Sequence, residues 1–127
     1  MTETQDITSR SDIELVIRKF YEKLLVDETV GFLFTEVVQL NLDEHIPRLV
    51  DFWEDQLLGS NKYSGNPMRV HMGLHSKSSL NTEHFDRWLK LFQETIDHHF
   101  TGIKANLAKE RALSIATVMR IKISRLT

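Results

Sequence analysis

Cysteine is completely absent from the sequence. Its absence excludes disulfides, zinc ribbons, iron–sulfur clusters and thiol nucleophiles. Thioether attachment of a cofactor is excluded for the same reason. A chain without thiols suits the reducing interior of a cell, so we expect a cytoplasmic location.

Long apolar runs and an excess of charge of one sign are missing too. No stretch approaches the roughly 20 apolar residues that a membrane-spanning helix needs, and the polar segment from Met1 to Arg10 does not resemble a signal peptide. The net charge of −2 gives no electrostatic reason to expect a nucleic acid or a membrane as a partner. Glycine-rich phosphate loops, a nucleophile elbow and paired catalytic carboxylates do not occur.

What is present is the composition of an ordinary globular domain. The chain has 127 residues, of which 41% are hydrophobic and 27% charged. We find no internal repeat and no composition shift that would mark a second domain. We therefore expect one monomeric domain over residues 1–127, in which residues 1–10 form a flexible N-terminal tail.

Glycine and proline are scarce, with five and two residues, and they fall where helices should begin or end. Apolar residues recur at three- and four-residue steps in four segments. We predict helices from a capping box at Ser11–Glu14 to about Leu25, from about His45 to Leu58, from Thr82 to Phe100, and from Lys104 to about Leu126. Pro47 fits the start of the second helix, and Gly59 fits a left-handed cap at its end. No segment alternates with period two, so the predicted fold class is all-α.

A short helix opened by Asn66-Pro67 carries the first candidate ligand, His71. Met68 and Met72 flank it, and apolar neighbours suit a flat macrocycle such as haem, whose iron needs a proximal imidazole. A histidine at the surface, or one satisfied within the core, is the commoner interpretation of such a position.

A second metal hypothesis comes from His75, four residues after His71 and on the same helix face. This spacing is compatible with zinc or non-haem iron, but the site would need a third ligand, for which Glu83 or His84 is nearest. The pair lacks the glutamate that follows the first histidine in zinc proteases. His98 and His99 point about 100 degrees apart and are interpreted as surface residues.

Three polar aromatic side chains on other predicted helices could line a ligand pocket: Tyr21, His45 and Trp88. A buried tyrosine hydroxyl must find a partner, and a tryptophan indole N–H can only donate. Each has a commoner structural interpretation. Tyr21 could lie at the boundary of the core, Trp88 within the core as we expect for Trp53, and His45 at an exposed helix start.

Taken in order, the segments resemble the third group of the bacterial truncated haemoglobins, from about Asp12 to Ile123. The resemblance is carried by Phe20-Tyr21-Glu22-Lys23, Val30-Gly31-Phe32-Leu33-Phe34, His45 eight residues before Trp53, Leu57-Leu58-Gly59, Tyr63-Ser64-Gly65-Asn66-Pro67, His71, and His84-Phe85-Asp86-Arg87-Trp88-Leu89-Lys90-Leu91-Phe92. The chain also shares with this group the absence of glycine-glycine pairs.

The resemblance implies a two-over-two helical sandwich around one haem b (iron protoporphyrin IX). It implies His71 as the proximal iron ligand, and Tyr21, His45 and Trp88 as distal residues. Phe34 matches an aromatic that packs against the porphyrin. Further expected haem contacts are Phe20, Leu49, Phe52, Tyr63, Met68 and Phe92. Arg48, Lys62 and Arg69 are alternative partners for the haem propionates.

The implied function is reversible binding of dioxygen, carbon monoxide, nitric oxide or other small haem ligands, as in oxygen transport. A haem enzyme with nitric oxide dioxygenase or peroxidase-like activity is the alternative. It would need an external reductase, since the chain has no flavin or nicotinamide motif. The third hypothesis is a haem-free helical interaction domain or a zinc site at His71 and His75.

Overall fold

The computed structural model describes residues 4–32, 42–59 and 82–124. These residues form four helices: α1 (Arg10–Leu25), α2 (Leu42–Leu58), α4 (Thr82–His99) and α5 (Ile103–Ser124). The described segments contain no strand. Gln5 and Phe100 form an isolated β-bridge. The predicted all-α class is confirmed.

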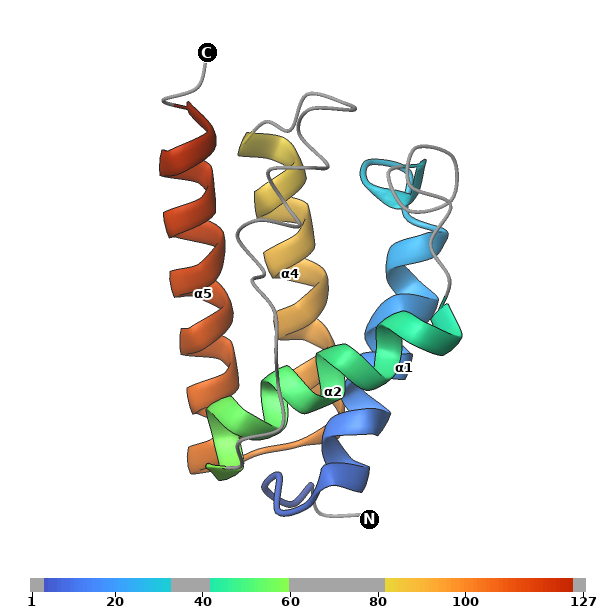
Figure 1. The fold of residues 1–127 in the computed structure, drawn as a ribbon, viewed down its shortest axis with the longest axis vertical. Helices are drawn as coiled ribbons and strands as arrows, with labels where there is room; N and C mark the ends of the chain where they lie inside the picture. Colours follow the sequence, from blue (N-terminus) through green and yellow to red (C-terminus); the bar gives the residue numbers. More distant parts are fainter. Residues whose placement is uncertain (1–3, 33–41, 60–81, 125–127) are drawn as a thin grey trace.

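The helices form two packed pairs (Figure 1). α4 and α5 run side by side in opposite directions, and α2 crosses α1. α1 also packs against α4, and α2 also packs against α5, so each pair covers the other. This is the two-over-two arrangement of helices that the resemblance implies. None of the helices in the described segments is both long and apolar enough to cross a membrane.

α1 begins two residues earlier than the capping box at Ser11 predicts. Ser9 is the N-cap, and its hydroxyl accepts a hydrogen bond from the backbone N–H of Asp12. Asp12 in turn accepts from the backbone N–H of Thr8 at 2.9 Å. The prediction was wrong because Ser9 and Asp12 have the same three-residue spacing as Ser11 and Glu14, and in this earlier pair Ser9 caps the N–H of Asp12 while Asp12 binds the N–H of Thr8, just before the cap.

α2 also begins earlier than predicted, at Leu42 rather than about His45, which leaves Pro47 inside the helix. Asp43 and Glu44 occupy the first turn, where negative charge is stabilised by the helix dipole. Pro47 has no N–H with which to bond the carbonyl of Asp43, four residues earlier. Asp43 and Glu44 are exposed, so this first turn is accessible to water. At the other end Gly59 has φ +74°, which confirms the predicted left-handed cap.

The core lies between the two pairs and is dominated by aliphatic and aromatic side chains. Its largest fully buried members include Phe92, Ile13, Ile17, Leu24, Ile96 and Val50. Trp53 is buried as predicted. Ala105, Ala108 and Ala112 on α5 are also buried, and these small residues allow α5 to lie close to its neighbours.

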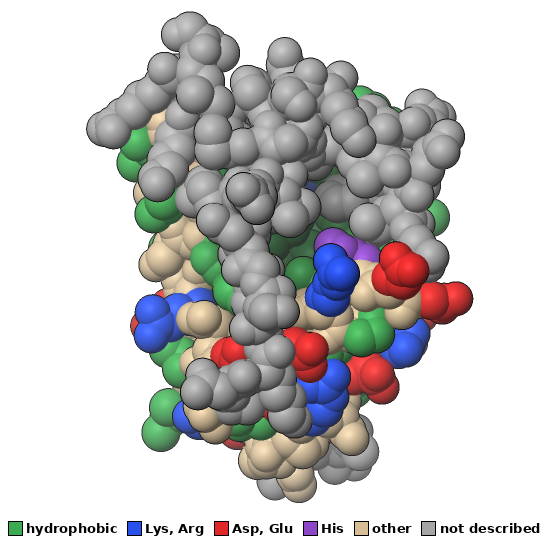
Figure 2. All heavy atoms as spheres, viewed as in Figure 1, with side chains coloured by type: hydrophobic (Ala, Val, Ile, Leu, Met, Phe, Trp, Pro, Cys, Tyr) green, Lys and Arg blue, Asp and Glu red, His purple; other side chains and the backbone are tan. Residues whose placement is uncertain are grey.

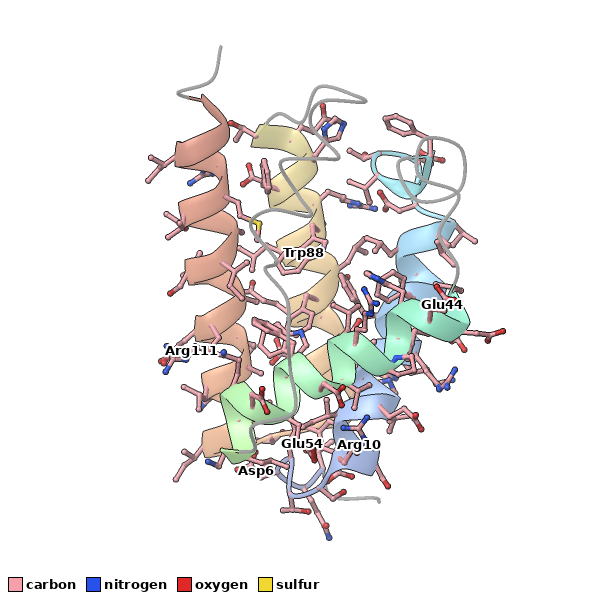
Figure 3. The ribbon with its side chains drawn as sticks, viewed as in Figure 1. Asp6, Arg10, Glu44, Glu54, Trp88 and Arg111 are labelled. Carbon is pink, nitrogen blue, oxygen red and sulfur yellow. The ribbon has the colours of Figure 1, made fainter. Side chains whose placement is uncertain are left out.

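The segment before α1 departs from the expectation of a flexible tail. Ile7 is only 2% exposed and belongs to the core. Asp6 lies at the start of α5, where it accepts hydrogen bonds from the backbone N–H groups of Lys104 and Ala105 at 2.9 and 2.8 Å (Figure 3). Gly102, at φ +144°, permits this approach, because a Cβ there would lie 2.5 Å from the Asp6 carboxyl carbon. Asp6 therefore caps a helix that begins almost 100 residues later in the sequence.

Asp6→Ala should lower the free energy of unfolding by about 1 kcal/mol, the usual cost of losing a cap. Burial opposes the charge of Asp6, but the N–H groups of Lys104, Ala105 and Ile7 outweigh it and hold the pKa of Asp6 below its ordinary 3.8. The stability that Asp6 adds is therefore fully present above pH 3.8, its ordinary pKa. It is lost as the pH falls through the lower pKa that Asp6 has in the folded protein.

Urea unfolding at neutral and acid pH would measure the difference. Asp97→Ala is the matched control, because Asp97 pairs with Lys109 at an exposed position. Equal losses in the two variants would contradict a capping role for Asp6.

Candidate functional site

A hydrogen bond between Tyr21 and His45 joins α1 to α2. The Tyr21 hydroxyl lies 2.7 Å from Nε2 of His45, and the two rings meet edge to face at 5.5 Å. Tyr21 is buried and His45 is half-buried. The sequence places Tyr21 here because it follows Phe20 on the apolar face of α1, and His45 lies in the first turns of α2. Two of the three predicted distal residues are thus in direct contact.

The ionisation of Tyr21 follows from its burial. With 5% of its surface exposed, desolvation disfavours the phenolate and raises the pKa of Tyr21 far above the ordinary value of 10.0. The side chain therefore remains a neutral phenol at physiological pH. It keeps one proton to donate and an oxygen that can accept.

Trp88, the third predicted distal residue, lies on α4 and is partly buried against the core (Figure 3). Its ring is stacked on Phe92 at 5.7 Å and meets the edge of Phe20 at 5.8 Å. Phe20 also meets Tyr21 edge to face at 5.6 Å. The ring of Phe20 thus stands between the two donors. Edge-to-face contacts therefore hold Tyr21 and Trp88 against the same ring.

The predicted wall residues divide by their burial. Phe20 and Phe92 are 2% and 1% exposed and support the donors from the core. Leu49 and Phe52, from α2, are partly buried and keep accessible apolar surface. In Figure 2, hydrophobic side chains are visible in the centre of the face, next to a histidine and a basic side chain. The contact of these four wall residues with a cofactor stays a prediction.

Several predicted site residues lie outside the described part of the chain. These are the proximal ligand His71, the haem contacts Phe34, Tyr63 and Met68, the second histidine His75, and the propionate candidates Lys62 and Arg69. Arg48 is described and exposed. Within the described segments no three His, Cys, Asp or Glu side chains are grouped as a metal site.

The chemistry of the described residues fits one side of a haem pocket. The Tyr21 phenol meets the His45 imidazole between α1 and α2, Trp88 of α4 contacts the same Phe20 ring as Tyr21, and the surfaces beside them are aromatic and aliphatic. A haem ligand needs hydrogen-bond donors on one face of the macrocycle and an otherwise apolar, dry setting. The described residues supply both features.

Sequence reasoning missed one interaction near the site, between Asp27 and Arg87. Arg87 Nε donates to Asp27 Oδ1 at 2.7 Å, and the Asp27 side chain is only 3% exposed. The only local signal is the position of Asp27 in a turn after α1. Its partner is 60 residues away in sequence, so spacing could not have identified it.

Comparisons with known proteins give a consistent result. The family model described as "Bacterial-like globin" matches residues 5–124. The group 3 truncated hemoglobin ctb of Campylobacter jejuni is 30% identical over 112 residues, or 86% of each chain. The group 1 truncated hemoglobin GlbN of Synechocystis is 32% identical over 75 residues, or 58% of each chain. The crystal structure of group III truncated hemoglobin from Campylobacter jejuni matches with a TM-score of 0.82, at 26% identity and with 95% of both chains covered.

The raised pKa of Tyr21 has a direct spectroscopic consequence. The chain has two tyrosines, Tyr21 and Tyr63. In an alkaline titration followed by ultraviolet difference absorbance, Tyr21 should stay protonated until the protein unfolds. Tyr21→Phe should remove this late step, and Tyr63→Phe, the matched control, should retain it. Ionisation of Tyr21 near pH 10 in the folded protein would contradict its burial.

Proposed function

The chain belongs to the bacterial-like globin family, as a group 3 truncated haemoglobin, and from this premise we propose that it binds dioxygen and related diatomic gases. As a globin it is a haem protein. The hydrogen bond of 2.7 Å between the buried Tyr21 hydroxyl and His45 is the observation that supports the proposal most strongly. A buried polar pair beside an aromatic donor has the properties of a pocket for a small polar ligand.

We assign His71 as the ligand that holds the iron of haem b. When bound, haem supplies a coordination position for a diatomic gas and passes electron density to it. The described residues would act on that gas. Leu49 and Phe52 offer apolar surface that excludes water, and Tyr21 and Trp88 offer protons to the outer atom of the ligand.

The Tyr21–His45 bond determines where the Tyr21 proton points. A phenol has one proton, so Tyr21 cannot donate both to His45 and to a bound gas. We propose that His45 carries its proton on Nε2 and donates to the Tyr21 oxygen. The Tyr21 hydroxyl can then act as a donor to a ligand in the pocket. In this arrangement His45 orients Tyr21 before the ligand arrives.

The two donors should discriminate between gases. Dioxygen held by a haem would carry partial negative charge on its outer atom, whereas carbon monoxide would carry much less. A net hydrogen bond is worth about 1 kcal/mol, and more in a dry site. Tyr21 and Trp88 together should therefore slow the release of dioxygen on the order of tenfold or more, with a smaller effect on carbon monoxide.

Tyr21→Phe should consequently speed dioxygen release by about fivefold or more, because one donor is lost. Carbon monoxide release should change far less, and it serves as the internal control. Stopped-flow measurement of both release rates on the haem-loaded protein would test this. Equal changes for the two gases would contradict a hydrogen-bonding role for Tyr21.

Nitric oxide or peroxide detoxification is a second candidate function, because the Tyr21–His45 bond could also carry a proton to a reacting ligand. Such an enzyme would take its electrons from a separate reductase. Steady nitrate production or peroxide consumption with an added reductant, faster than with free haem, would support an enzyme. Rates equal to those of free haem would leave gas binding as the function.

A further inference from the structure

The ion pair between Asp27 and Arg87 differs from the other charged contacts of α4. The Asp27 side chain is 3% exposed, whereas Asp97 and Asp86, which pair with Lys109 and Arg120, are 61% and 64% exposed. The Arg87 side chain is 38% exposed, so the shielding is partial; it strengthens the attraction between the charges and reduces competition from water at the carboxylate. The Asp27–Arg87 contact can therefore fix a geometry that the exposed pairs cannot.

Asp27 is itself held rigidly in the turn that follows α1. Its Oδ2 accepts from the backbone N–H groups of Thr29 at 2.9 Å and Val30 at 3.2 Å. Its Oδ1 is the atom that accepts from Arg87 at 2.7 Å. Its backbone carbonyl accepts from the N–H of Gly31 at 3.0 Å. With both carboxylate oxygens engaged, Asp27 offers Arg87 a fixed point of attachment.

The charge on Asp27 persists in spite of this burial. Desolvation opposes ionisation, but the Arg87 guanidinium and the N–H groups of Thr29 and Val30 outweigh it and lower the pKa of Asp27. The carboxylate is therefore ionised at neutral pH, and the contact with Arg87 is a charge-assisted hydrogen bond.

The place of the pair in the fold gives it a link to the pocket. α1 carries Tyr21, and Asp27 lies just beyond the end of this helix. α4 carries Trp88, and Arg87 is the residue before it. The ion pair thus joins the two helices that hold the two proposed donors. One member of the pair, Arg87, directly precedes the proposed donor Trp88 in the sequence.

Aromatic packing alone defines the position of Trp88 less closely than a hydrogen-bonded ion pair on the same helix does. Its described ring contacts are the stack on Phe92 and the edge of Phe20, at centroid distances of 5.7 and 5.8 Å. Offset stacks tolerate sliding of one ring over another at little cost. A hydrogen-bonded ion pair has a narrower geometry, so it can set the register of α4 against α1 that the rings leave adjustable.

We propose that Asp27 and Arg87 are positioning residues for Trp88, and that their ion pair sets the distance of its indole N–H from a gas ligand in the pocket. This inference rests on the proposed function of Trp88 as a donor. Neither Asp27 nor Arg87 touches the ligand. They act through the register of α4.

A double-mutant cycle on the haem-loaded protein tests the proposal. Asp27→Asn keeps the size of the side chain and an acceptor for the turn, but removes the charge that holds Arg87. We expect it to speed dioxygen release by about threefold, less than Trp88→Phe, since the donor is displaced rather than lost. In a Trp88→Phe background the same substitution should change release very little.

The infrared C–O stretch of the carbon monoxide complex is the second measurement. It reports the polarity around the ligand and does not respond to a general loss of stability. Asp27→Asn should shift the band in the same direction as Trp88→Phe. Arg87→Gln, which breaks the pair from the other side, should repeat the shift. Asp86→Asn is the matched control, because it breaks the exposed Asp86–Arg120 pair one residue from Arg87 and should leave band and rate unchanged.

The outcomes separate this inference from the function on which it rests. If Trp88→Phe speeds dioxygen release but Asp27→Asn and Arg87→Gln leave rate and band unchanged, the positioning role is refuted and the donor role stands. Equal effects of Asp27→Asn with and without Trp88 also refute it, because the substitution then acts through another group. If Trp88→Phe itself has no effect, the donor role fails and the positioning role fails with it.

Discussion

The burial of one face of α1 against two different helices is the constraint on which the rest of the structure depends. Phe20 and Tyr21 are neighbours in α1, so their side chains leave the helix about 100 degrees apart. Phe20 packs against Trp88 and Phe92 of α4, and Tyr21 meets His45 of α2. One turn of helix therefore brings the two halves of the candidate pocket together. Tyr21 and His45 meet because the apolar side chains beside them are packed.

Part-buried charged contacts mark the places where segments are joined. Arg10 of α1 pairs with Asp51 and Glu54 of α2 at 2.7 and 3.1 Å, where the two helices meet (Figure 3). Asp6 caps α5, and Asp27 meets Arg87 on α4. In the described part of the chain no buried side-chain nitrogen or oxygen lacks a hydrogen-bond partner. Because an unpaired buried polar group is costly, each of these contacts favours one arrangement of the helices over its alternatives.

Helical periodicity was enough to predict the fold class and most of α4 and α5, because their apolar faces recur at helical spacing. Gly59 and Trp53 were also predicted correctly from local chemistry. The start of α1 was misplaced because two capping pairs compete within a few residues. The role of Asp6 and the pairing of Asp27 could not be read from the sequence, since both depend on partners 60 or more residues away. The three pocket candidates were named from their side-chain chemistry and given distal positions by a resemblance, and only the fold could show that Phe20 contacts both Tyr21 and Trp88.

The central claim is that the donors on α1, α2 and α4 face a haem whose iron is held by His71. Visible absorption spectra of the haem-loaded protein, reduced and with carbon monoxide, test it most directly. We predict histidine-ligated bands that are lost in His71→Ala, return when imidazole is added, and persist in His75→Ala. Bands that are unchanged in His71→Ala, or a flat spectrum after incubation with haem, would contradict the claim.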